Sequence, residues 1–133
     1  MKAAMKFIAI ISLTFLLSGC ATLADSVAAK GTGEFRVYDE PYELVWNTVL
    51  QVISESKLQL ISESSQSGQI LAQRGVSALS YGDNVAIFVE RFGGEESTRV
   101  EVVSKKAMST TVFSKNWETE VLAQLTAKLY SAG

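Results

Sequence analysis

The side chain with the clearest capacity for a chemical reaction is that of Cys20, the only cysteine of the chain. It directly follows Ser18 and Gly19, two small residues that leave the backbone accessible to a peptidase. The chain begins with a segment that contains two lysines and no acid, and an apolar run over residues 7–17 follows it. A basic start followed by a short apolar run is typical of a secretory signal. As a helix the run would be roughly 16 Å long against about 30 Å of hydrocarbon, so it is too short to span a membrane.

The stretch Leu17–Cys20, read Leu-Ser-Gly-Cys, resembles the lipobox of bacterial lipoproteins. In that family the bond before the cysteine is cut, the thiol carries a diacylglycerol, and the new amine is usually acylated. The resemblance implies a cleaved signal peptide over residues 1–19, cleavage between Gly19 and Cys20, and a membrane anchor on Cys20. Ala21 in place of an aspartate implies transfer to the inner leaflet of the outer membrane, facing the periplasm. The alternatives are an ordinary signal peptide or a buried free cysteine.

Composition argues against several classes of function. The chain has no histidine, so the commonest general base and the commonest metal ligand are missing. A single cysteine forms neither an internal disulfide nor a thiolate metal cluster. Twelve Lys and Arg against fourteen Asp and Glu give a formal net charge of −2, without the basic excess that nucleic-acid binding needs. We therefore expect no metal, no nucleic acid and no cofactor other than the lipid joined to Cys20.

One pair of residues resembles a catalytic motif. Ser54 and Lys57 have the S-x-x-K spacing of penicillin-binding enzymes, in which the lysine activates the serine. The nearest stretch to the K-T-G partner motif, KGTG at residues 30–33, contains an inserted glycine, and the S-D-N element is missing. The simpler interpretation places both residues at the end of a helix, where a lysine complements the helix dipole. The sequence therefore predicts a protein that is not an enzyme.

The mature chain divides into a short spacer and one domain. Residues 20–33 begin with the lipidated cysteine, are small and weakly polar without a clear period, and predict a flexible tether. The alternative is an extra helical turn in TLADSVAAK, residues 22–30. The periodic pattern from residue 34 to residue 133 predicts a single domain that starts with a short strand around Phe35 and Val37.

The domain combines two amphipathic helices with a run of strands. From Pro41 to about Ser56 the apolar residues share one face at helical spacing, and a second apolar stripe begins at Trp117 with Ser114 or Asn116 as its cap. Strand patterns cover residues 58–63, 69–74, 84–92 and 98–106. Consecutive strands joined by short turns favour an antiparallel meander. The predicted fold class is α+β, with about five strands, both helices packed on one face, and the order β-α-β-β-β-β-α.

The same region resembles a group of small outer-membrane lipoproteins of uncharacterised function. The resemblance spans residues 34–130 and rests on the stretches YELVWNTVLQVI, GQILAQR and VLAQLTAKL. The layout of strand, helix, meander and helix is similar to the helix-grip domains of BamC, a lipoprotein of the outer-membrane assembly machine. The resemblance implies the two-layer fold and brings no catalytic residues with it.

The strand predicted at residues 84–92 is apolar on both faces. Helices on one side of a two-layer domain cover only one face, so the other face would be exposed and would mark a partner site. The candidate partner surface consists of Phe88, Ala86 and Val103. The alternative is that the loops over residues 75–84 and 107–113 cover this face.

Four basic residues lie near predicted strand ends, namely Arg91, Arg99, Lys105 and Lys106. They would either contact anionic lipid head groups or peptidoglycan, or form a solvated face together with Glu90 and Glu101. The sequence as a whole favours a non-enzymatic accessory or adaptor subunit of a cell-envelope assembly, with an envelope protein as partner. The alternative is a carrier of a lipid or another apolar small molecule.

Overall fold

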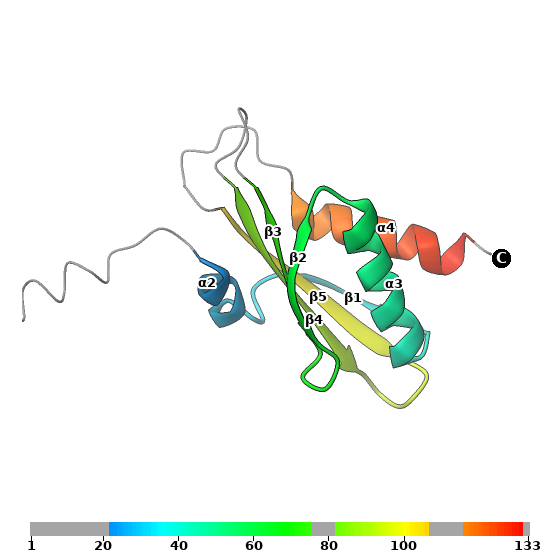
Figure 1. Cartoon of the computed structure of the whole chain (residues 1–133). Coiled ribbons are helices and arrows are strands. Elements are labelled where there is room, and N and C mark those ends of the chain that lie inside the picture. Colours follow the sequence, from blue (N-terminus) through cyan, green and yellow to red (C-terminus); the bar gives the residue numbers. More distant parts are fainter. Residues whose placement is uncertain (1–21, 76–81, 107–115, 132–133) are drawn as a thin grey trace, which may run out of the picture.

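The structure, a computed structural model, describes residues 22–75, 82–106 and 116–131. These residues form a central sheet with helices on both of its faces (Figure 1). The predicted signal peptide over residues 1–19 and Cys20 lie outside the described residues. So do the loop at 107–113 and most of the loop at 75–84, the two segments weighed as covers for the sheet.

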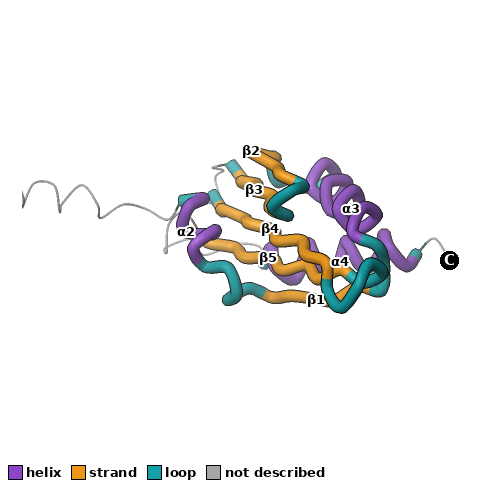
Figure 2. Tube along the Cα trace, turned by 90° about the horizontal axis from the view of Figure 1, so that it is seen from below, coloured by secondary structure: helices purple, strands orange, loops and turns teal. Residues whose placement is uncertain are grey.

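A five-stranded antiparallel sheet forms the centre of the molecule, as predicted. Its strands are β1 (Glu34–Tyr38), β2 (Gln59–Ser64), β3 (Gln69–Arg74), β4 (Asp83–Arg91) and β5 (Thr98–Lys106). They lie in the order β1-β5-β4-β3-β2, so that β1 and β2 are the two edge strands (Figure 2). The last four strands form the expected meander, and β1 extends it by pairing with β5, with Phe35 opposite Glu101.

Two helices cover one face of the sheet, which we call the inner face. They are α3 (Tyr42–Glu55) and α4 (Trp117–Tyr130), and both lie on the same side in Figure 1. Their apolar stripes pack against every second residue of the strands. The fully buried members of this cluster include Val45, Val49, Leu122, Leu125, Ile70, Ile87, Val100 and Val102. The predicted α+β fold class, with both helices on one face, is confirmed.

Local signals fix where these elements begin and turn. Asn116 caps α4, since its side chain accepts a hydrogen bond from the backbone N–H of Thr119 at 3.3 Å. The turn between β2 and β3 contains Gly68 with a φ of +71°, a conformation that favours glycine. A Cβ atom there would also lie 2.1 Å from the carbonyl oxygen of Val89. The turn therefore depends on glycine for both its conformation and its close approach to β4.

The prediction of a flexible tether over residues 20–33 is wrong for the part that the structure describes. Leu23–Ala28 form a helix, α2, which agrees with the alternative of an extra helical turn. The carboxylate of Asp25 accepts hydrogen bonds from the backbone N–H and the hydroxyl of Thr22, at 2.6 and 3.2 Å. Six residues do not form a stable helix alone. The helix persists because it packs on the face of the sheet opposite α3 and α4, which we call the outer face (Figures 1 and 2).

The predicted partner surface is therefore buried. Ala86, Phe88 and Val103 are 0, 4 and 1% exposed, and they pack with Ala29 and Leu71 in a small second cluster. The cover that the structure shows comes from α2 and the residue after it, so the prediction of an exposed surface at these positions is wrong. The strand β4 is apolar on both sides because it lies in the middle of three layers.

Candidate functional site

A buried carboxylate on β5 fastens the segment after α2 to the outer face. Glu101 is fully buried, and its Oε2 accepts hydrogen bonds from the backbone N–H groups of Gly31 at 2.7 Å and Gly33 at 2.9 Å. Its Oε1 has no hydrogen-bond partner among the described residues and lies 3.7 Å from the guanidinium of Arg99. A buried charge is costly unless it is paired and hydrogen-bonded, and these contacts offset that cost. The prediction that Glu101 belongs to a solvated face is wrong.

The helix α2 makes further contacts along its length. Ser26 is fully buried, and its hydroxyl donates a hydrogen bond to the carbonyl of Asn84 at 3.1 Å. After the helix ends, the ammonium of Lys30 pairs with Glu90 at 2.5 Å and lies 5.1 Å from the centre of the Phe88 ring. These contacts go to β4 and those of Glu101 to β5, so α2 and the residues after it are joined to two neighbouring strands. The helix is therefore part of the folded domain and not a spacer in front of it.

The outer face is open beyond α2. Phe35 and Val37, on the edge strand β1, are 54 and 42% exposed. They lie opposite Glu101 and Arg99, which places them on the outer face by strand alternation. Phe92 is 50% exposed as well, but it follows β4, which β5 separates from the edge strand β1. We call Phe35 and Val37 the open patch, since exposed apolar side chains on an edge strand are a candidate partner surface.

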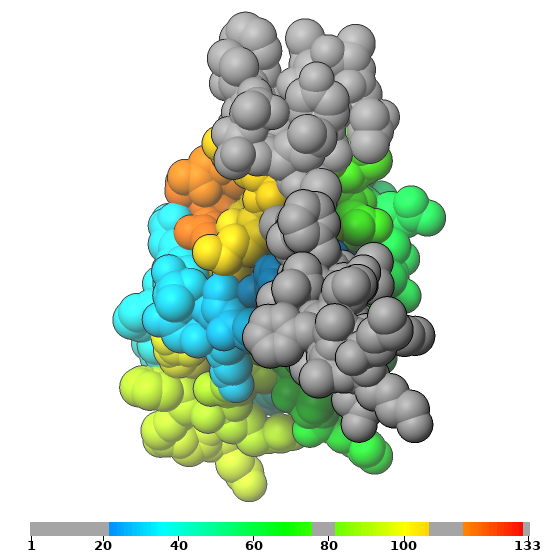
Figure 3. Space-filling view, turned by 90° about the vertical axis from the view of Figure 1, so that its left-hand side faces the viewer, coloured from blue at the N-terminus to red at the C-terminus, as the bar shows by residue number. Residues whose placement is uncertain are grey.

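The four basic residues do not form one contact surface. In the register of β4 and β5, Arg91 and Arg99 lie near the turn that joins the two strands, whereas Lys105 and Lys106 lie at the opposite end. Figure 3 shows this separation, with the yellow end of β5 and the yellow-green turn at opposite ends of the molecule. The guanidinium of Arg91 also stacks on the ring of Tyr42, 4.2 Å from its centre. The interpretation that all four basic residues contact lipid head groups at one site is therefore wrong, because the two arginines lie at the opposite end of the sheet from the two lysines.

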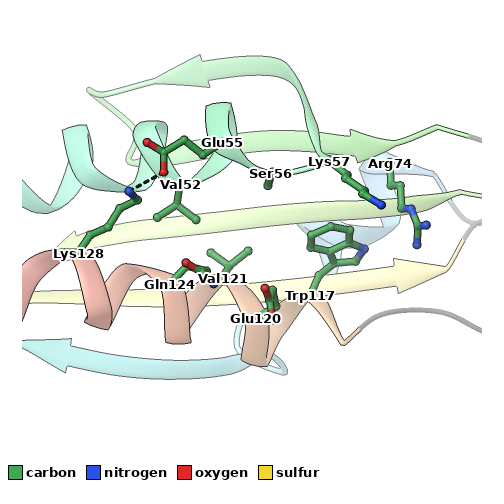
Figure 4. Close-up of a pocket in the computed structure, with 10 residues that line it drawn as sticks. All are labelled: Val52, Glu55, Ser56, Lys57, Arg74, Trp117, Glu120, Val121, Gln124 and Lys128. Carbon is green, nitrogen blue, oxygen red and sulfur yellow. Dashed lines mark ion pairs between the residues drawn. The ribbon is translucent and has the colours of Figure 1, made fainter. Parts of the chain in front are cut away.

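A pocket of about 360 Å³ lies between α3 and α4, a volume that falls in the range of small-molecule sites (Figure 4). Its apolar lining comes from three buried side chains, Val52, Trp117 and Val121. Its polar lining comes from Glu55, Ser56, Lys57, Arg74, Glu120, Gln124 and Lys128. The pocket therefore combines an apolar wall with charged groups of both signs.

The charges of the pocket are divided between its two ends. At one end Lys128 pairs with Glu55 at 2.5 Å, and the hydrogen bond from Lys128 lowers the pKa of the Glu55 carboxyl below its ordinary value. At the other end the side chains of Lys57 and Arg74 lie beside the Trp117 ring (Figure 4). Two cations next to an aromatic wall favour a ligand that carries an anionic group on an apolar body.

The ring of Trp117 is held in place from behind by a buried acid. Its Nε1–H donates a hydrogen bond to Oδ2 of Asp83 at 3.1 Å, and Asp83 is only 1% exposed. Asp83 belongs to the YGDN stretch at residues 81–84, which has the composition of a turn. Gly82 has a φ of +103°, as such a turn requires, and Asp83 and Asn84 begin β4.

The S-x-x-K pair shows no catalytic arrangement. The hydroxyl of Ser54 donates a hydrogen bond to the carbonyl of Gln51 at 2.8 Å on the exposed side of α3, while Lys57 lines the pocket. Over residues 22–75, 82–106 and 116–131, no group of three or more metal-ligating side chains comes together. In the same ranges no helix has the length and apolar character needed to cross a membrane.

Sequence reasoning missed both the docked helix and the pocket. The signal for α2 was present, because Thr22 and Asp25 have the spacing of a capping box, [ST]-x-x-[DE]. The pocket had no local signal, since its residues come from α3, the end of β3 and α4. The role of Glu101 had no local sequence signal either, because its partners Gly31 and Gly33 are far from it in the sequence.

Comparisons with known proteins identify no relative that shares this geometry. No protein-family model matches the chain, and a search of curated proteins finds no similar sequence. The resemblance to bacterial lipoproteins therefore rests on Leu17–Cys20 and on the pattern of the domain.

Proposed function

We propose that this chain is a lipid-anchored protein of the outer membrane whose domain faces the periplasm and acts as a non-enzymatic adaptor in a cell-envelope assembly. The lipobox-like stretch Leu17–Cys20 supports the anchor. The observation that carries the adaptor role is the open patch on the outer face, where Phe35 and Val37 are exposed on the edge strand β1.

The edge strand β1 suits the addition of an extended partner segment. Among the described residues it pairs with β5 alone, and an edge strand offers unpaired backbone groups to a further strand. Phe35 and Val37 are two residues apart, so both project from the outer face about 7 Å from each other. The other edge strand, β2, is less suited because a register shift between Leu60 and Ser62 interrupts its pairing.

The test is to purify the full-length protein from its own envelope in mild detergent and to measure intact masses of everything that co-elutes. Val37→Glu places a charge in the open patch, and it should release a stoichiometric partner protein. Leu60→Glu is the matched control, because Leu60 is 43% exposed on the opposite edge strand against 42% for Val37. The control should retain the partner.

Two outcomes would contradict the adaptor role. An acylated chain that elutes with no other protein would remove the partner from the proposal. A partner that is lost equally from both variants would place the contact elsewhere. Circular dichroism of each variant would show whether the domain still folds, and both residues are exposed enough that we expect it to fold.

The second candidate is a carrier of a small molecule, and the pocket between α3 and α4 favours it. The polar lining suits an amphipathic anion better than a wholly apolar chain. Native mass spectrometry of the gently extracted protein would detect such a ligand. The double variant Lys57→Glu, Arg74→Glu should lose it, whereas Lys105→Glu, Lys106→Glu makes the same change of charge outside the pocket and should retain it.

A further inference from the structure

The proposed anchor joins the folded domain almost without a spacer. Cys20 precedes Thr22, the cap residue of α2, by two residues, and two residues span at most about 7 Å when fully extended. We infer that α2 is a rigid strut that holds one end of the sheet against the bilayer surface. This inference rests on the proposed lipidation of Cys20 and adds an orientation to it.

The strut is fixed at more than one point. Ser26 bonds to the backbone of β4, and Gly31 and Gly33 both bond to Glu101 on β5. Gly33 also lies so close to β5 that a Cβ atom would be 2.2 Å from the carbonyl oxygen of Val102. A domain that moved farther from its anchor than the two residues before Thr22 allow would have to break these contacts. The attachment therefore transmits the position of the lipid to the sheet.

The contacts of α2 define which end of the sheet is next to the anchor. Ser26 lies beside Asn84 at the start of β4, whereas Gly31 lies farther along, beside Glu101 in the middle of β5. The helix therefore begins near the end where β4 starts and β5 finishes, which we call the anchor end. Lys105 lies opposite Asn84 at this end, and both it and Lys106 are exposed.

The opposite end of the sheet, which we call the far end, carries exposed acids. Glu95 and Glu96 lie in the turn between β4 and β5, and Asp39 and Glu43 lie where β1 leads into α3. These four acids outnumber the two arginines at this end, Arg99 and Arg91, the second of which lies 3.9 Å from Glu43. The nine residues of β4 separate the two ends by about 30 Å, and Figure 3 shows them at opposite ends of the molecule. A bilayer of anionic phospholipid attracts the exposed lysines and repels these acids. Charge and attachment thus favour the same orientation.

The orientation can be measured with one fluorophore at each end of β3. Gly75→Cys places a thiol at the anchor end, where an added Cβ meets no atom of the described residues within 4 Å. Gln66→Cys places one in the exposed turn before β3, at the far end. In the acylated protein the sulfur of Cys20 is blocked, so each variant has one free thiol to label. Each is reconstituted into vesicles of phosphatidylcholine and phosphatidylglycerol that contain a nitroxide head-group lipid, which quenches nearby dyes.

We expect several-fold stronger quenching at position 75 than at position 66. A matched pair of proteins carries about ten Gly and Ser residues inserted before Thr22, a segment that spans roughly 18 Å on average. The spacer leaves the anchor and the sheet unchanged and uncouples them. The difference between the two labels should then largely disappear.

Each outcome decides a separate point. Equal or reversed quenching in an acylated protein overturns the strut and leaves the proposed adaptor function standing. A difference that survives the spacer unchanged also overturns the strut, because the charges alone would then orient the domain. An intact mass without acylation at Cys20 overturns the anchor, and both the strut and the proposed location are lost with it.

Discussion

The two faces of the sheet are covered in different ways. On the inner face, nineteen buried residues of the helices α3 and α4, of the strands and of the segments next to them form one apolar cluster. On the outer face, three buried strand residues form a small cluster, and polar contacts of Ser26 and Glu101 complete the attachment of α2. Burial of apolar area stabilises the whole domain, whereas a few directional contacts stabilise one docked segment. The inner face should therefore control global unfolding and the outer face local release of α2.

The largest effect is expected from two neighbours on β4 that point to opposite faces. Ile87→Ala removes a fully buried side chain from the large cluster and should lower the free energy of unfolding by about 3 kcal/mol. Phe88→Ala should cost less, about 2 kcal/mol, because release of α2 limits the loss to that helix. Urea unfolding measures both. A larger loss for Phe88→Ala would contradict the contrast between the faces.

The next effect concerns the buried carboxylate. Glu101→Leu leaves the N–H groups of Gly31 and Gly33 without their acceptor and should weaken the docking of α2 by about 2 kcal/mol. Exchange of the amide hydrogens of Ser26–Ala29 should then speed up by about thirtyfold. Glu101→Gln keeps an acceptor oxygen and should show a smaller change. If the variant alters exchange equally in α3, the docking of α2 is not a local event.

A smaller effect is expected at the close approach of the chain to β5. Gly33→Ala pushes a Cβ atom against the carbonyl oxygen of Val102 and should cost about 1 kcal/mol, which lowers the melting temperature by roughly 4–8 °C. The added methyl group of Gly75→Ala meets no atom within 4 Å in the part of the chain that the structure describes, so this variant serves as the control. Thermal unfolding followed by circular dichroism measures both variants. Equal melting temperatures would show that the segment moves away without cost.

The smallest effect belongs to the ion pair at the rim of the inner layer. Lys128 lowers the pKa of Glu55 in the folded state, so the pair stabilises the protein above the ordinary pKa of a glutamate and loses this effect as the pH falls through the lowered pKa. Lys128→Met should therefore reduce stability slightly at neutral pH and leave it unchanged in acid. Melting temperatures over a pH series measure this. A constant difference at all pH values would assign the effect to packing.

The inner face could be predicted from the sequence because its signals are local and periodic. One signal is the apolar helical stripe that includes Val45, Val49 and Val52, and another is the alternation of residues along β5. Each of them indicates, within a single element, which side is buried. The outer face could not be predicted in this way. The six residues of α2 are small and mildly polar, so they look like a linker, and their stability comes from strands much later in the chain.

The candidate sites show the same limit. The prediction placed Phe88 correctly as an apolar residue on the second face of β4. Its exposure was wrong because α2, whose composition resembles that of a linker, covers it. Exposure of Phe35 and Val37 depended on where α2 stops. The pocket depended on the meeting of α3, β3 and α4, which no single stretch of sequence encodes.

The docking of α2 also constrains the order in which parts of the domain can fold. The partners of Ser26 and Gly31 lie 58 and 70 positions later in the chain. The helix cannot reach its place until β4 and β5 have been synthesised and have paired. If Cys20 is lipidated as proposed, the order of synthesis exposes it to the processing enzymes before α2 can dock beside it.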